Sequence, residues 1–111
     1  MEISFATPRL EKLCNSAKEL RGKLGPNCAR RLRLRLDEMA AADCLDDLRK
    51  LPQTRCHELT GNLKGQLAVD LEHPKRLLFE PDHEPQPSKP DGGLDWQQVT
   101  KVRILSIEDY H

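Results

Sequence analysis

Long hydrophobic runs and aromatic side chains are both scarce in this chain of 111 residues. Aromatic residues make up 4% and apolar residues 37%, against 32% charged residues and a mean hydropathy of −0.69. No apolar run approaches the roughly 20 residues that a helix needs to cross a bilayer. The first residues, Met-Glu-Ile-Ser, lack the basic and apolar regions of a secretory signal. We therefore expect a cytoplasmic protein with no membrane partner and with a core of modest size.

Closely spaced cysteine pairs are also missing. The four cysteines lie 14, 16 and 12 residues apart, so the C-x-x-C spacing of many metal sites does not occur. Without a secretory signal, disulfides are not expected either. Cys14 and Cys28 stand beside apolar helix positions, which favours small buried thiols. The histidines and carboxylates show no ligand spacing, and we expect neither a metal nor a cofactor.

Charge of one sign does not dominate overall, since 18 basic residues balance 18 acidic ones, but the two ends of the chain differ. Residues 1–36 carry nine basic and three acidic side chains, a net charge of +6, and the remaining 75 residues carry −6. This asymmetry indicates a polyanion or an acidic partner for the first third of the chain. The alternative is that solvated helix faces are simply rich in arginine. The length predicts one domain spanning residues 1–111.

The first third of the chain has helical periodicity after a short strand at residues 2–6. Thr7 and Pro8 are typical of a helix start, and wound at 100° per residue the segment 7–22 places its apolar side chains on one face. Pro26 opens a second helix, in which Arg35 and the other arginines fall outside the apolar stripe and only Leu34 is misplaced. The stripe of this second helix consists of Ala29, Leu32, Leu36, Met39 and Ala40. We expect a helical hairpin with an arginine-rich outer surface.

Strand-like alternation replaces the helical pattern after one further helical turn at 44–48. The four runs lie at residues 55–59, 65–71, 76–79 and 99–107. Residues 80–95 contain four of the eight prolines and predict an exposed loop that interrupts a hairpin. The fold class that follows is α+β, with the helical hairpin packed on a small antiparallel sheet.

A set of short motifs in the second half resembles a known family. The set consists of a histidine-x-leucine-x-glycine turn at 57–61, a strand, an arginine before the apolar strand 76–79, and Asp-Tyr-His at 109–111. In this order they resemble the HigB-like plasmid maintenance killer toxins of the RelE/ParE superfamily. The expected fold is RelE-like. Thr60 departs from the pattern, because some members carry lysine there.

The resemblance implies an endoribonuclease toxin of a type II toxin–antitoxin system, which cuts messenger RNA on the ribosome without a metal. Attack by a ribose 2′-hydroxyl needs a base, an acid and positive charge on the phosphate. Histidine suits the first two roles and arginine the third. The resemblance places His57 and His111 as acid and base, Arg76 as the phosphate clamp, and Asp109 and Tyr110 as orienting groups.

The partners implied by the resemblance are the ribosome, messenger RNA and a HigA-like helix-turn-helix antitoxin. Residues expected to contact RNA phosphates are Arg30, Arg31, Arg33 and Arg35 on the helix and Lys64 near the turn. Two other functions remain open on the sequence. One is a ParE-like inhibitor of DNA gyrase, and the other is a nucleic-acid-binding or partner-binding module whose catalysis has decayed.

Overall fold

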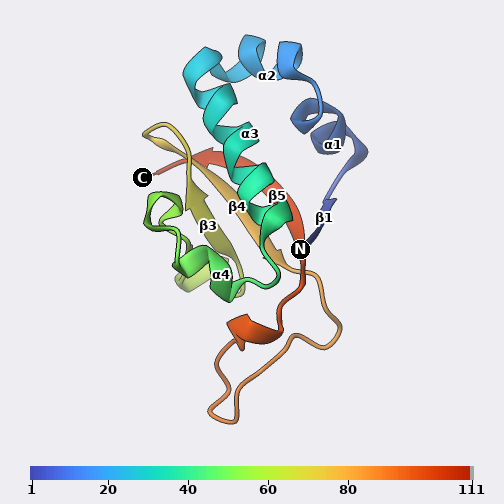
Figure 1. Cartoon of the computed structure of the whole chain (residues 1–111), viewed down its shortest axis with the longest axis vertical. Helices are drawn as coiled ribbons and strands as arrows, with labels where there is room; N and C mark the ends of the chain where they lie inside the picture. The colour runs from blue at the N-terminus through green and yellow to red at the C-terminus, as the bar shows by residue number, and fades with distance from the viewer. Residues whose placement is uncertain (111) are drawn as a thin grey trace.

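The computed structural model describes residues 1–110 and combines helices with one sheet, so the α+β prediction is confirmed (Figure 1). The helices are α1 (Pro8–Cys14), α2 (Ala17–Leu24), α3 (Pro26–Ala41) and α4 (Asp46–Arg49). The strands are β1 (Glu2–Phe5), β2 (His57–Glu58), β3 (Leu67–Asp70), β4 (Lys75–Pro81) and β5 (Lys101–Asp109). Short 3₁₀ turns lie at η1 (Pro52–Thr54), η2 (Gly61–Leu63) and η3 (Trp96–Gln98). None of the helices within residues 1–110 is long and apolar enough to cross a membrane.

The helix predicted over residues 7–22 is in fact two helices. Thr7 begins the first, where its hydroxyl accepts a hydrogen bond from the backbone N–H of Leu10 at 3.1 Å. Ser16 begins the second in the same way, accepting from the N–H of Glu19 at 3.2 Å. A side-chain oxygen that satisfies backbone donors favours a new start over continuation of the helix. Because the direction changes between α1 and α2, Ala17 is exposed rather than part of the predicted stripe.

The apolar stripe of α3 is close to the predicted one, with two corrections. Leu32, Leu36 and Met39 are buried, and Leu34 is 50% exposed. Ala40, predicted in the stripe, is exposed. Arg35, predicted on the outer surface, is only 4% exposed, because it lies one helical turn from Leu32 and Met39 on the packed side. The outer surface of the helix therefore carries fewer arginines than the sequence suggested.

The sheet has five strands in the order β1-β5-β4-β3-β2. The four strands from β2 to β5 pair antiparallel, as predicted, with a register shift between Leu78 and Phe79 of β4. The first strand differs, because β1 pairs parallel with β5 and places Ile3 opposite Val102. A parallel pair needs a long connection, which nearly the whole chain supplies here.

The helices cover one face of the sheet (Figure 1). Leu77 and Phe79 of β4 are fully buried and belong to the same core as Leu32 and Leu36 of α3. Successive side chains of a strand point to opposite faces, so Arg76 lies on the face without helices. This face carries the candidate site described below, and the outer side of α3 lies on the opposite side of the sheet.

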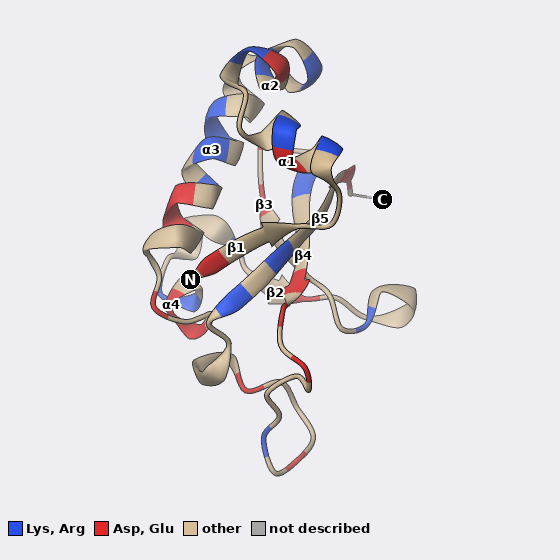
Figure 2. Cartoon of the chain, turned by 90° about the vertical axis from the view of Figure 1, so that its right-hand side faces the viewer, with Lys and Arg blue, Asp and Glu red and all other residues tan. Residues whose placement is uncertain are grey.

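The proline-rich segment interrupts the β4–β5 hairpin, as predicted. Figure 2 shows it extending away from the sheet. Its first residues, Glu80 and Pro81, belong to β4, and the segment closes on itself through a bridge between Ser88 and Leu94. Trp96 then returns the chain to the core at 6% exposure.

The cysteines are free thiols, and Cys14 and Cys28 are buried as predicted. Their burial raises the pKa of both thiols above the usual value. Among residues 1–110, no group of three or more histidine, cysteine, aspartate or glutamate side chains is placed to hold a metal ion.

Candidate functional site

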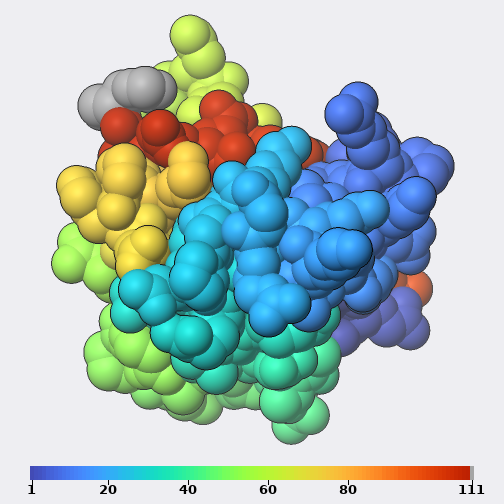
Figure 3. All heavy atoms as spheres, turned by 90° about the horizontal axis from the view of Figure 1, so that it is seen from above, coloured from blue at the N-terminus to red at the C-terminus, as the bar shows by residue number. Residues whose placement is uncertain are grey.

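A groove of about 790 Å³ opens beside the turn between β3 and β4 and the end of β5. Viewed from above, the turn (yellow) and the end of β5 (red) lie side by side (Figure 3). The groove is lined by Arg55, Cys56, His57, Asp70, His73 and Tyr110. Two of the residues predicted from sequence, His57 and Tyr110, therefore share one site, although more than 50 positions separate them along the chain.

Asp70, at the end of β3, holds the groove together. One carboxylate oxygen accepts a hydrogen bond from the Tyr110 hydroxyl, and the other pairs with Nε of Arg55 at 3.0 Å. The backbone N–H of Tyr110 also donates to the carbonyl of Pro74 at 2.8 Å. The phenol ring is thus fixed at both ends, by its hydroxyl and by its backbone.

Arg76 lies next to this pair with an unsatisfied donor. Its guanidinium carbon is 4.7 Å from the centre of the Tyr110 ring, a cation–π contact. The Nε atom is buried and has no hydrogen-bond partner among the described residues. Asp70, directly opposite in the β3–β4 register, accepts from Tyr110 and Arg55, and Glu80 pairs with Arg103. A buried donor without an acceptor is costly. The Arg76 side chain as a whole is partly exposed, and a guanidinium group is suited to binding an anion.

His57 is exposed on β2, and its tautomer follows from its hydrogen bond. Nδ1 lies 2.7 Å from the carbonyl oxygen of Arg55. A carbonyl oxygen only accepts, so Nδ1 carries the proton and Nε2 of the neutral ring is the basic nitrogen. Arg55 has a left-handed backbone with a φ of 48°, which is uncommon for a residue with a side chain. Arg55 is a lining residue of the groove. Strained backbone conformations are often found at functional sites.

Two groups that line the groove have raised pKa values, and burial is the first cause of both shifts. The pKa of Tyr110 is raised, first by burial and then by the hydrogen bond to Asp70 and its charge, while Arg76 and Arg55 oppose the shift. Burial raises the pKa of the Cys56 thiol to about 12. Cys56 is therefore protonated at neutral pH and unsuited to act as a nucleophile, because the thiolate is the reactive form.

Of the other predicted residues that the structure describes, none is among the lining residues of the groove, and Arg76 only borders it through Tyr110. Asp109 pairs with Lys75 at 2.8 Å, and Lys64 is exposed after η2. His111 lies outside the described residues. The remaining predicted residues are on α3, where Arg30, Arg31 and Arg33 are exposed and Arg35 is buried.

Four lining residues were absent from the sequence prediction of the site: Arg55, Cys56, Asp70 and His73. Asp70 could have been predicted from the sequence. In a tight β3–β4 hairpin, the residue that ends the first apolar run lies opposite Arg76, which begins the next. Arg55 and His73 carried no such signal. They reach the groove through the turns that flank β2 and β4.

Comparisons with known proteins support the architecture. No protein-family model matches the sequence, and no curated protein matches it significantly. Among solved structures, the chain is similar to a YoeB/ParE toxin from Agrobacterium tumefaciens, with a TM-score of 0.52, 6% sequence identity and 100% of both chains covered. At this identity the likeness concerns the fold. The chain therefore has the α+β fold of a YoeB/ParE toxin.

Proposed function

We propose that this chain is the toxin of a toxin–antitoxin system and that it cuts messenger RNA on the ribosome, with the groove as its active site. The observation that carries the proposal is that His57 and Tyr110 line one groove, with Arg76 stacked on the Tyr110 ring. His57 offers a basic Nε2 there, and Arg76 offers positive charge beside it. The fold of a YoeB/ParE toxin supports the same class of function.

The proposed reaction is an intramolecular transesterification, in which a ribose 2′-oxygen displaces the 5′-oxygen from the adjacent phosphate. His57 Nε2 takes the proton of a ribose 2′-hydroxyl, and the oxygen then bonds to the adjacent phosphorus. The bond from phosphorus to the 5′-oxygen breaks, and His111 gives this oxygen a proton. The products are a 2′,3′-cyclic phosphate and a 5′-hydroxyl end. General acid or base catalysis of this kind typically raises the reaction rate by about 10²- to 10⁴-fold.

Positive charge stabilises the crowded phosphate in this scheme. The partly exposed Arg76, stacked on Tyr110, and the exposed Arg55, which lines the groove, supply this charge. Tyr110, held by Asp70, presents its ring for stacking on a base or its hydroxyl to the phosphate. Asp109 orients the end of β5 through its pair with Lys75.

The partners are part of the same proposal. A HigB-like toxin would be inhibited by a HigA-like helix-turn-helix antitoxin. The exposed arginines of α3, Arg30, Arg31 and Arg33, with Lys64, would contact ribosomal RNA phosphates. Arg35 is removed from this set because it is buried.

The decisive experiment is cleavage of an end-labelled messenger RNA by the purified chain, with and without programmed ribosomes. We expect cuts only with ribosomes, and we expect His57→Ala to abolish them. His83→Gln is the control, because His83 lies outside the groove, where its Nε2 accepts from the N–H of Thr100 at 3.1 Å, and glutamine keeps an acceptor. No cleavage by folded wild-type protein would refute the nuclease proposal. Inhibition of DNA supercoiling by the same sample would then support the gyrase alternative.

A further inference from the structure

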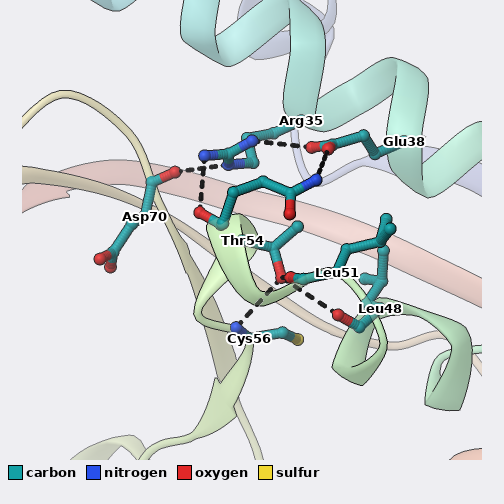
Figure 4. Close-up of polar contacts among 8 residues, drawn as sticks. Arg35, Glu38, Leu48, Leu51, Thr54, Cys56 and Asp70 are labelled. Carbon is teal, nitrogen blue, oxygen red and sulfur yellow. Dashed lines mark hydrogen bonds and ion pairs between the residues drawn. The ribbon is translucent and has the colours of Figure 1, made fainter.

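Arg35 of α3 makes three hydrogen bonds to three different segments, although its side chain is almost fully buried (Figure 4). Nε donates to the backbone carbonyl of Asp70 at 2.7 Å, and Nη2 donates to the backbone carbonyl of Gln53 at 2.8 Å. Nη1 pairs with Glu38 Oε1, one turn along the same helix, at 2.8 Å. A single side chain thus connects α3, the end of β3 and the 3₁₀ turn η1.

The neighbours of Arg35 are themselves held in place. The side chain of Gln53 donates to the second oxygen of Glu38 at 2.8 Å, which closes a ring of three residues through the backbone carbonyl of Gln53. Next to it, Thr54 donates its hydroxyl to the carbonyl of Leu51 at 2.9 Å and accepts from the N–H of Cys56 at 3.3 Å. These bonds fix the short stretch of chain that carries Arg55 into the groove.

The two backbone segments that Arg35 holds both contribute lining residues to the groove. One ends in Asp70, and the other, through Gln53 and Thr54, leads directly to Arg55. Asp70 and Arg55 then pair with each other across the groove, and Asp70 accepts from Tyr110. A shift in either segment would change the position of the carboxylate on which Tyr110 depends.

Burying a guanidinium group in a core costs desolvation free energy. Replacing buried ion pairs by apolar side chains of similar size is often neutral or stabilising, so burial of Arg35 with Glu38 is weak evidence for a role in stability. Two of its donors are used on backbone carbonyls, whose positions an apolar side chain does not fix. Orientation is therefore the property that arginine supplies here and that leucine or methionine does not.

We propose that Arg35 is a positioning residue for the groove, which sets the distance between the segments of Asp70 and Arg55 and thereby holds Tyr110. Arg35 does not line the groove and is not assigned any contact with substrate. The inference rests on the proposed function only where it concerns turnover of RNA. Its structural part concerns the environment of Tyr110 alone.

Tyr110 provides the readout, because it is the only tyrosine of the chain. Its ionisation is followed directly by the ultraviolet absorbance of the phenolate in the purified full chain. The charged groups that face it are Asp70, Arg76 and Arg55. The hydrogen bond from the phenol to Asp70 favours the neutral ring, so loss of this bond moves the titration midpoint down, toward the usual value of about 10.

The test variant is Arg35→Lys, which keeps the charge but has no planar fork to reach three acceptors. We expect a lower Tyr110 titration midpoint and a kcat reduced about 10- to 100-fold with little change in KM, as for a misplaced catalytic group. The control is Arg21→Lys on α2, an exposed arginine that does not line the groove and is not assigned any RNA contact. We expect the control to match the wild type in both measurements.

An unchanged Tyr110 titration in a folded Arg35→Lys protein would overturn the proposal. If this variant fails to fold, Gln53→Ala replaces it, since it removes only the bond from Gln53 to Glu38 and leaves the backbone carbonyls in place. Gln53→Ala should lower the Tyr110 titration midpoint by a smaller amount, and the absence of a shift would also overturn the proposal. If the wild type cuts no RNA while the titration shifts as expected, the nuclease proposal fails and the positioning role stands.

Discussion

The hydrogen bond between Tyr110 and Asp70 should contribute measurably to stability, and a double-mutant cycle isolates it. Tyr110→Phe removes only the hydroxyl. Hydrogen bonds to charged groups are worth about 1.5 to 3 kcal/mol, but the Asp70 side chain is 23% exposed, and water replaces part of what is lost. We therefore expect Tyr110→Phe to cost about 1 to 2 kcal/mol.

Asp70→Ala removes the same bond and also the pair with Arg55. The Arg55 side chain is 76% exposed, so this second pair adds only about 0 to 1 kcal/mol. In the double variant the Tyr110 bond is already absent, and the two single costs should overlap. The coupling energy expected from the cycle is about 1 to 2 kcal/mol.

Urea unfolding followed by fluorescence of the single tryptophan, Trp96, measures all four proteins of the cycle. A parallel cycle of Asp70→Ala with Arg55→Ala serves as the control and should give less than about 1 kcal/mol. If Asp70 and Tyr110 proved additive within about 0.3 kcal/mol, the description of the carboxylate as the anchor of the phenol would be refuted.

Three further outcomes follow from the packing and the buried thiol. Leu32→Ala, at a fully buried position, should lower the free energy of unfolding by about 2 to 5 kcal/mol, whereas Leu34→Ala at a half-exposed position should change it by less than about 0.5 kcal/mol; equal losses in urea unfolding would contradict the orientation of α3. The pKa of Cys56 is about 12 in the folded protein against an ordinary 9.0, so the free energy of unfolding should fall as pH rises from about 9 to 12. Cys56→Ala should remove up to about 4 kcal/mol of this decrease, measured by unfolding curves taken across that pH range. Trp96→Phe deletes the bond from Nε1 to Glu58 at 3.2 Å and should cost about 1 kcal/mol by thermal unfolding, with an unchanged midpoint telling against a role for that bond.

The fold was largely predictable where side-chain periodicity decides the structure. The spacing of Leu32 and Leu36 placed α3 correctly, and the alternating runs located the antiparallel strands. The break at Ser16 was not predicted, because a serine within an apolar pattern is compatible both with continuation and with a new start. The parallel pairing of β1 with β5 was not predicted either, because it joins segments that are distant in sequence and are not linked by a hairpin turn.

The site was predictable only in part, and for a different reason. The motif resemblance singled out His57, Arg76 and Tyr110; His57 and Tyr110 line one groove, and Arg76 stacks on the Tyr110 ring. Arg35 was assigned to the wrong surface because helical winding places it outside the apolar stripe, and the acceptors that allow its burial come from later segments. The role of Asp70 as a shared acceptor likewise depends on contacts between segments, which a local pattern does not contain.

The pairing of β1 with β5 has a consequence for the order in which the molecule assembles. During synthesis the first strand leaves the ribosome early, but its hydrogen-bonding partner is made near the end of the chain. Long-range contacts of this kind form late, because the entropy of closing a long loop opposes them. The strand that completes the sheet also delivers Tyr110 to Asp70. The groove therefore forms only after β5 and Tyr110 have emerged, so a chain that stops before them carries no assembled site.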